Sequence, residues 1–223
     1  MELREYPDRE LLFMQLADRL AGDLRETLLT HDRASFSVPG GTTPGPVFDI
    51  LSAVDLNWGQ VDVLLNDERW VPETSERSNT ALLRRRLLTG RAAEARLVPL
   101  YAPADQPEGV LDELAATVET VLPLSVLLLG MGADMHTASL FPGADRLSDA
   151  LSPDAPVLMP MRAPGAPEPR ITLTAQVLRA ALKTHVLIVG DEKREALEQS
   201  RTMSAEDAPV TAVLGDAVVH WAP

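Results

Sequence analysis

Leucines recur every fourth position in the first part of the chain. Between residues 11 and 29 they stand at positions 12, 16, 20, 24 and 28, with charged residues between them. A spacing close to 3.6 residues places these side chains on one face of a helix. The pattern therefore predicts an amphipathic helix over residues 11–29.

Four later runs are short and almost continuously apolar, which is typical of strands buried on both faces of a parallel sheet. They cover residues 34–38, 61–65, 124–129 and 185–189. Helical patterns come between and around these runs, at residues 44–52, 79–88, 108–122, 175–182 and 192–200. Alternating strands and helices predict one doubly wound α/β domain over residues 1–223, a Rossmann-like three-layer fold with a mostly parallel sheet and helices on both faces.

A polar or glycine-rich loop follows each of the four predicted strands. Ligands of doubly wound sheets bind beyond the carboxyl ends of the strands, so these loops are expected to form the functional site. Residues 152–169 differ in composition, because they contain six prolines. We expect them to form a surface connection between the two halves of the sheet, with a lid over the site as the second interpretation.

Composition narrows the choice of partners. The formal net charge of −13 argues against nucleic acid, which requires a basic surface to neutralise phosphates. No apolar run approaches the roughly 20 residues that span a bilayer, and the first residues do not resemble a secretory signal. The chain has no cysteine, which excludes disulfides and thiolate chemistry. We expect a cytosolic protein.

The first candidate loop contains Gly40, Gly41, Thr42 and Thr43 and leads from a predicted strand into a predicted helix. Glycines let the backbone approach an anion, while hydroxyls and helix N-terminal N–H groups donate to it. The loop is a candidate site for a phosphate or a sugar hydroxyl, with a tight turn and a capping Thr as the structural alternative. Pro and Val occupy the positions where a P-loop carries Lys and Ser/Thr, which disfavours nucleoside triphosphate chemistry.

The second candidate loop begins with Gly130 and Gly132. Met135 stands at the third glycine of the dinucleotide motif G-x-G-x-x-G, so the motif fails and NAD binding is rejected. Asp134 and His136 can point from this loop into one cleft. We expect residues 137–141 to form one helical turn, whose N-terminal dipole would keep His136 neutral and able to act as a base near pH 7.

The remaining histidines, His31, His185 and His220, have no such company and are expected to be structural. Asp67 and Arg69 directly follow a predicted strand. Arg69 could neutralise an oxyanion while Asp67 orients water or a substrate hydroxyl, and a solvated loop is the alternative.

Two further cations are candidate phosphate anchors. Arg170 precedes the segment Ile-Thr-Leu-Thr, and Lys193 follows a Gly-Asp-Glu sequence. Arg offers a planar fork of donors, and Lys offers a point charge. Their structural alternatives are an ion pair within a loop and a surface lysine in the first turn of a helix.

Six segments in this order resemble the 6-phosphogluconolactonase family, within the wider glucosamine-6-phosphate isomerase/deaminase-like group. They are PGGTTP (39–44), NDERWVP (66–72), SN (78–79), LGMGADMHTASLFPG (129–143), RIT (170–172) and GDEK (190–193), and they span nearly the whole chain. The resemblance implies hydrolysis of 6-phosphogluconolactone to 6-phosphogluconate in the oxidative pentose phosphate pathway. It also implies that no metal or cofactor takes part.

The sequence departs from the family pattern at two positions. Met135 stands where the pattern has Gly, and at a positive φ this would cost about 1 to 2 kcal/mol and could crowd the sugar. Thr42 stands where the pattern usually has Ser, a change that keeps the hydroxyl.

A lactonase needs a base and a place for the oxyanion. The sequence has no Cys, no G-x-S-x-G motif and no H-E-x-x-H motif, which leaves direct attack by water. His136 is expected to take the proton of the water, and Asp134 or Asp67 to fix the geometry. Arg69 and the backbone amides of residues 130–132 are expected to stabilise the oxyanion.

Arg170, Lys193 and the loop of residues 40–43 are expected to hold the phosphate of a phosphorylated sugar lactone. Two alternatives stay open: isomerase/deaminase chemistry on an amino sugar phosphate, and a non-catalytic sugar-phosphate sensor in which Met135 has disabled the loop. The sequence leaves the oligomeric state open and is compatible with a monomer.

Overall fold

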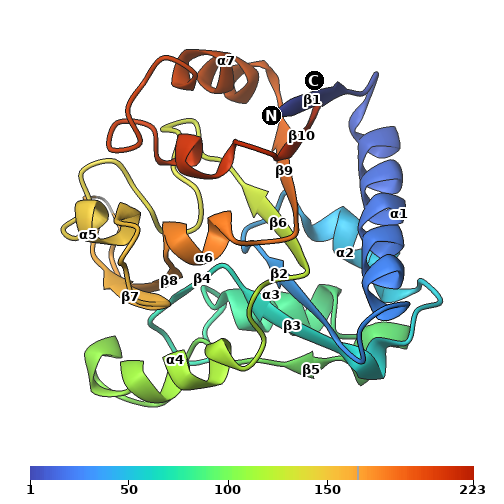
Figure 1. Ribbon diagram of the computed structural model, residues 1–223, viewed down its shortest axis with the longest axis horizontal. Helices are drawn as coiled ribbons and strands as arrows, with labels where there is room; N and C mark the ends of the chain where they lie inside the picture. The colour runs from blue at the N-terminus through green and yellow to red at the C-terminus, as the bar shows by residue number, and fades with distance from the viewer. Residues whose placement is uncertain (165) are drawn as a thin grey trace.

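The computed structural model describes residues 1–164 and 166–223, and it is built around a seven-stranded parallel sheet (Figure 1). In spatial order the strands are β1 (Glu2–Glu5), β10 (Val218–Ala222), β9 (Lys183–Val189), β6 (Val126–Gly130), β2 (Ala34–Val38), β3 (Val61–Leu65) and β5 (Arg96–Leu97). A smaller antiparallel sheet contains, in the order β4-β8-β7, β4 (Asp67–Arg69), β8 (Arg170–Leu173) and β7 (Leu158–Met161).

Helices cover both sides of the large sheet. They are α1 (Arg9–Leu28), α2 (Gly45–Ser52), α3 (Asn79–Arg86), α4 (Leu111–Glu119), α5 (Leu147–Leu151), α6 (Ala175–Arg179) and α7 (Asp191–Ser200). Short 3-10 helices are η1 (Trp58–Gln60), η2 (Gly90–Glu94), η3 (Pro107–Gly109) and η4 (Pro209–Val213). Figure 1 shows α1 and α2 to the right of the sheet, and α5, α6 and the small sheet to its left. The predicted doubly wound α/β class is confirmed.

The long helix α1 is stabilised by a buried leucine face and a capped N-terminus. Its Leu12, Leu16, Leu20 and Leu24 are fully buried, and Asp8 caps its N-terminus by accepting a hydrogen bond of 2.8 Å from the Leu11 amide. The helix thus begins two residues before the range predicted from the leucines. The four predicted strands are also present, as β2, β3, β6 and β9, with bounds shifted by up to two residues.

The prediction that residues 152–169 form only a surface connection was wrong. Their middle part is β7, whose four residues are all buried. β7 pairs with β8 and lies at the edge of the small sheet. Pro160 is tolerated there because an edge strand does not need every backbone N–H for pairing. The prolines of this segment are typical of a loop, so the sequence did not predict the strand.

Asn66, between β3 and β4, joins the two sheets. Its backbone N–H donates to Val38 O (2.9 Å), and its backbone carbonyl accepts from the Leu173 N–H (2.9 Å). Its side chain accepts from Ser37 Oγ (2.6 Å) and donates to Leu128 O (2.8 Å). The residue is fully buried, and these four bonds fix where the chain leaves the large sheet for the small one.

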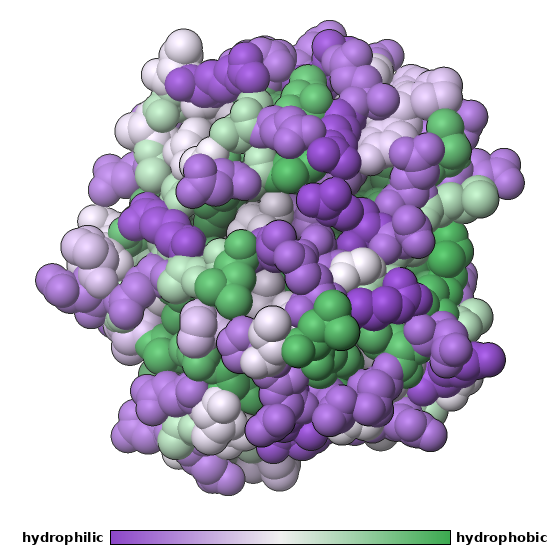
Figure 2. Space-filling view, turned by 45° about the vertical axis from the view of Figure 1, so that its right-hand side comes forward, coloured by the Kyte–Doolittle hydropathy of each residue, from purple (hydrophilic) through white to green (hydrophobic). Residues whose placement is uncertain are grey.

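On the face in Figure 2, hydrophobic residues appear as small separate groups among polar ones. Within the described residues, no helix has the length and apolar character needed to cross a membrane.

Two of the histidines predicted to be structural belong to a buried chain of hydrogen bonds. Tyr6 OH lies 2.8 Å from His220 Nδ1, His220 Nε2 lies 3.0 Å from His185 Nδ1, and His185 Nε2 lies 2.8 Å from Asp23 Oδ2. One set of protons satisfies all three contacts: Tyr6 donates to His220, His220 donates to His185, and His185 donates to Asp23. His220 is neutral in this arrangement. The chain links β1, β10, β9 and α1, while His31 is exposed just beyond α1.

This network makes stability depend on pH. Burial, and then the neighbouring His185, lower the pKa of His220 to about 3. The unfolded chain binds this proton near pH 6.5. The free energy of unfolding is therefore expected to fall as the pH drops from about 6.5 towards 3, by up to about 1.4 kcal/mol per pH unit. His220→Gln should flatten this part of the profile in urea unfolding, while the exposed control His31→Gln should keep the wild-type slope. Equal slopes for all three proteins would contradict the assignment.

Candidate active site

A pocket opens at the carboxyl edge of the large sheet, where the sequence predicted it. β2 lies between β3 and β6, and the chain leaves β2 towards one side of the sheet and later returns on the other. This is the topological switch point at which doubly wound folds bind ligands. The pocket is lined by Pro39, Gly40, Gly41, Thr43 and Pro44 after β2, by Asp67 and Arg69 of β4, by Gly130, Met131, Gly132, His136 and Ala138 after β6, and by Asn79, Phe141, Arg170, Leu187 and Lys193.

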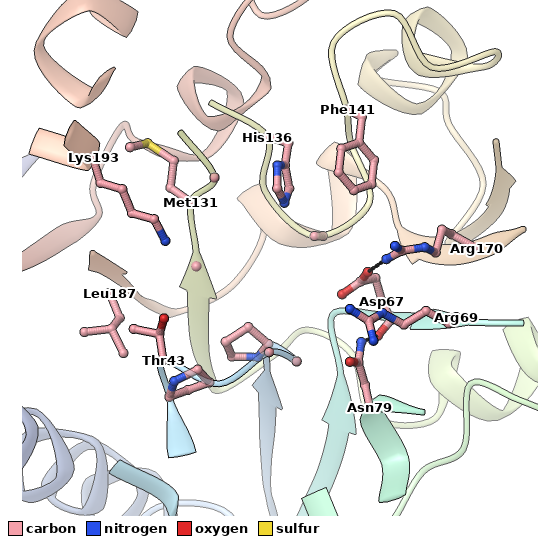
Figure 3. A pocket seen from close by; sticks show the side chains of 17 residues that line it. Thr43, Asp67, Arg69, Asn79, Met131, His136, Phe141, Arg170, Leu187 and Lys193 are labelled. Atoms are coloured by element: carbon pink, nitrogen blue, oxygen red, sulfur yellow. Dashed lines mark hydrogen bonds and ion pairs between the residues drawn. The ribbon is translucent and has the colours of Figure 1, made fainter. Parts of the chain in front are cut away.

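His136 is held in a defined orientation. Its Nδ1 lies 2.5 Å from Asp134 Oδ1, and its ring packs on Phe141 with ring centroids 4.2 Å apart. The hydrogen bond from His136 is the main reason why the pKa of Asp134 is lowered. A carboxylate at Nδ1 favours the tautomer with its proton there, which leaves Nε2 as a free acceptor. Figure 3 shows the imidazole directed into the pocket, whereas Asp134 is exposed and does not line it.

The prediction of a helical turn at residues 137–141 was wrong. Thr137 and Leu140 form an isolated antiparallel bridge, and Ala138 between them has a φ of 49°. A residue in the left-handed region cannot continue a right-handed helix. No helix dipole therefore acts on His136, and Asp134 supplies the control of its tautomer instead.

Met135 stands where the family pattern has Gly, and its φ is positive, at 65°. Its side chain is buried in the hydrophobic core, and its carbonyl accepts a hydrogen bond of 3.0 Å from Val210 N. It is not among the residues that line the pocket, so it does not crowd a ligand there. The departure from the family pattern costs backbone strain, and burial of the side chain offsets it.

Asp67, Arg69 and Arg170 lie together at one side of the pocket (Figure 3). β4 and β8 pair so that Arg69 faces Arg170, and Arg170 Nη1 lies 3.6 Å from Asp67 Oδ2. Ser139 Oγ donates to the same carboxylate at 2.5 Å. Burial lowers the pKa of Arg170, while the charge of Asp67 acts against this shift.

The two arginines have unused hydrogen-bonding capacity. Among the residues that the structure describes, the buried Nε atoms of Arg69 and Arg170 have no hydrogen-bond partner. Buried donors are nearly always paired in native proteins, so such atoms need an explanation. Both residues line the pocket, so their guanidinium groups present positive charge to an anionic ligand there.

Lys193 and Thr43 lie at the other side of the pocket, across from Arg170 (Figure 3). Lys193 extends from the first turn of α7, and Thr43 lies just before α2. The two cations expected to hold one phosphate are therefore not brought together. Thr42 is exposed and does not line the pocket, so its binding role stays a prediction.

Close contacts explain two of the glycines. A Cβ on Gly40 would lie 2.1 Å from Asn79 Cγ, and a Cβ on Gly132 would lie 2.2 Å from His136 Nδ1. Neither position accepts a side chain without moving the pocket wall. Gly132 N donates to His136 O at 3.0 Å, so this amide, which was expected to face an oxyanion, is already engaged.

Reasoning from the sequence did not assign roles to Asn79, Phe141, Ser139 and Glu68. Asn79 Nδ2 donates to Asp67 O at 3.1 Å, and Phe141 separates His136 from the Arg170 guanidinium, which lies 5.6 Å from the ring centroid. All four stand inside segments that carried the family resemblance. Their place in these segments was the only indication of a role in the sequence, because their contacts form only in the folded chain. Within the described residues, no three His, Asp or Glu side chains are grouped to hold a metal ion.

Fold and pocket together define the class of this protein, a doubly wound α/β fold with a pocket at the carboxyl edge of its sheet that is lined by two arginines, a lysine and a histidine. The chain belongs to the family described as glucosamine-6-phosphate isomerases/6-phosphogluconolactonase, whose model matches residues 7–221. It is 41% identical to a 6-phosphogluconolactonase of Rhizobium meliloti (strain 1021), over 93% of each chain. It is also 41% identical to one of Pseudomonas aeruginosa, over 93% of this chain and 89% of the relative. The crystal structure of a 6-phosphogluconolactonase from Shewanella baltica OS155 superposes with a TM-score of 0.96 at 31% identity, covering 100% of this chain and 98% of that one.

The strain at Met135 can be measured with two substitutions. Met135→Gly and Met135→Ala both remove the buried side chain and should each lower the free energy of unfolding, by about 2 kcal/mol or more for the Ala variant. Only Gly relieves the positive φ, so the Gly variant should be the more stable of the two by about 1 kcal/mol. Urea unfolding measures this difference, and the activity of the Gly variant should equal or exceed that of the wild type.

Met161 provides the matched control, because it is buried in β7 and does not have a positive φ. There the order should reverse, with Ala more stable than Gly. An Ala variant at position 135 that is at least as stable as the Gly variant would show that the left-handed backbone carries no cost.

Proposed function

We propose that this chain, in the cytoplasm, hydrolyses 6-phosphogluconolactone to 6-phosphogluconate in the oxidative pentose phosphate pathway. The observation that carries the proposal is the imidazole of His136, oriented by Asp134, in a pocket with cationic groups at both sides. A phosphorylated lactone needs such a site, because it carries a phosphate at one end and develops an oxyanion at the other. The names of the relatives support the same reaction.

His136 acts as the general base in this scheme. Its free Nε2 takes a proton from water as the water oxygen attacks the lactone carbonyl carbon. The tetrahedral intermediate collapses when the bond from this carbon to the ring oxygen breaks, and the imidazolium returns the proton to that oxygen. The product is an open-chain acid that ionises at neutral pH. Asp134 holds the imidazole and stabilises its charged form, so the contacts favour it over Asp67 for this role.

Arg69 and Arg170 stabilise the oxyanion and the product carboxylate. Both guanidinium groups have a buried Nε without a partner, and Arg170 is connected to His136 through the Phe141 ring. Asp67 keeps Arg170 in place. The amide of Gly132 takes no part, since it is bonded to the His136 carbonyl.

Lys193 and the loop of residues 40–43 hold the phosphate. The loop leads into α2, so the positive end of that helix adds to the charge of Lys193. Binding energy from the phosphate then positions the carbonyl beside His136, an effect that can supply several kcal/mol of the barrier. Arg170 lies across the pocket, so we assign it to the lactone end instead of the phosphate end.

One assay separates this function from its alternatives. Hydrolysis of the lactone by purified protein, measured fast and corrected for the spontaneous reaction, is expected to exceed the blank by orders of magnitude. Release of ammonia from glucosamine 6-phosphate would instead indicate isomerase/deaminase chemistry. Tight binding of 6-phosphogluconate with hydrolysis no faster than in buffer would indicate a sensor.

Removal of the base should act on turnover. His136→Ala is expected to lower kcat by roughly 10² to 10⁴ and to leave the binding of 6-phosphogluconate within a few-fold of the wild type. His31→Ala, at an exposed histidine outside the pocket, should keep full activity. Near-normal turnover in the His136 variant would remove this residue as the base.

The two sides of the pocket can be told apart with two lactones. Lys193→Ala should raise KM for the phosphorylated lactone and have little effect on the unphosphorylated gluconolactone. Arg170→Ala should lower kcat for both, because its contact is with the lactone end. If Arg170→Ala lost activity only with the phosphorylated lactone, Arg170 would be assigned to phosphate binding instead.

A further inference from the structure

Glu68 is a fully buried carboxylate next to the pocket, and it does not line it. Side chains alternate along a strand, so Asp67 and Arg69 of β4 face the pocket while Glu68 points to the opposite side. There it meets the N-terminus of α3. The catalytic scheme above makes no use of this group.

The Glu68 carboxylate accepts five hydrogen bonds. Oε1 accepts from the backbone amides of Arg69 (2.7 Å) and Asn79 (2.8 Å). Oε2 accepts from Thr80 N (2.7 Å), Thr80 Oγ1 (2.8 Å) and Ser78 Oγ (3.1 Å). In the described parts of the chain, no Lys, Arg or His nitrogen pairs with it within 4 Å. Its role is therefore to accept from neutral donors rather than to balance a neighbouring cation.

These bonds hold Arg69 at both ends. Oε1 fixes its backbone amide directly. Its guanidinium donates through Nη1 to Arg77 O at 2.6 Å, and Arg77 immediately precedes Ser78, whose hydroxyl is bonded to Oε2. Movement of the Glu68 carboxylate would therefore displace both the backbone and the head group of Arg69.

The same bonds reach two other walls of the pocket. Asn79 N is bonded to Oε1, and the Asn79 side chain donates to Asp67 O. The side chain also lies directly against Gly40, where a Cβ would come within 2.1 Å of it. One buried carboxylate thus sets the positions of Asp67, Arg69 and Asn79, which lie across the pocket from Lys193 (Figure 3).

We propose that Glu68 is a positioning residue for the reaction, which places Arg69 against the oxyanion without touching the substrate; the inference rests on the function proposed above. An acid is required because a carboxylate only accepts hydrogen bonds, whereas the amide of Gln would bring an NH₂ group among N–H donors. Displacing a catalytic group by about 1 Å can cost 10²-fold in rate. The phosphate side of the pocket, at Lys193, does not contact Glu68.

Glu68→Gln tests the proposal. It is expected to lower kcat by roughly 10- to 100-fold, while KM and the inhibition constant for inorganic phosphate, which report on the Lys193 side, stay within about three-fold. The melting temperature is measured in parallel. Asp62→Asn is the matched control. Asp62 is a buried carboxylate of β3 that accepts hydrogen bonds from Arg33 and Arg96, and none of these three residues lines the pocket. The substitution should lower the melting temperature and keep kcat.

A wild-type kcat in a folded Glu68→Gln protein would overturn the proposal. The proposal would also be overturned if Asp62→Asn lost as much activity as Glu68→Gln when the two variants lower the melting temperature equally. Should Glu68→Gln fail to fold, Thr80→Val removes one donor and keeps the carboxylate; it is expected to lower kcat several-fold, and Thr80→Ser, which keeps the hydroxyl, to restore it. Equal kcat for Thr80→Val and Thr80→Ser would overturn the proposal. A wild-type protein with no activity above the blank would overturn the proposed function, and the role of Glu68 with it.

Discussion

The four hydrogen bonds of Asn66 determine where the chain passes from the large sheet to the small one. This one buried residue ties β2, β6 and β8 to the end of β3, at the edge where the parallel strands end. Because all its polar groups are paired, moving it would leave several buried groups without partners. The chain is thereby forced to leave the large sheet at one point and to begin β4 immediately. The place where the chain leaves the large sheet therefore fixes the position of β4, which consists of Asp67, Glu68 and Arg69.

The charges of the pocket follow from that geometry. The pairing of β4 with β8 sets two arginines opposite each other, and Asp67 balances only part of their charge. The chain as a whole has a net charge of −13, yet charges beyond about 8 Å are screened at physiological ionic strength, so these local cations dominate for a bound anion. Lys193 forms a second cationic group across the pocket. A phosphorylated lactone suits this separation, because it carries a phosphate at one end and develops negative charge at the other during hydrolysis.

The loop that presents His136 is strained. Met135 and Ala138 both have positive φ, at 65° and 49°, and they lie on either side of the imidazole. Such conformations persist only when surrounding contacts enforce them, and they gather at functional sites. Here the enforcing contacts are the buried Met135 side chain, its carbonyl bond with Val210, and the bond from Thr137 Oγ1 to Gly130 O.

The central strands, the first helix and the set of loops at one edge could be predicted from the residues alone, because burial leaves a periodic pattern of apolar positions. It could not determine β7, whose prolines read as a loop, or the small sheet, since short edge strands have little pattern of their own. His136, Asp134, Asp67 and Arg69 could be selected from their positions after strands. The folded structure was needed to show that Arg170 and Lys193 stand apart, that Asp134 and not a helix end contacts His136, and that Glu68 accepts five hydrogen bonds beside the pocket. The separation of Arg170 from Lys193 depends on how strands pair and pack, and the contacts of Asp134 and Glu68 depend on the exact path of a loop or turn, so a pattern of residue types records neither.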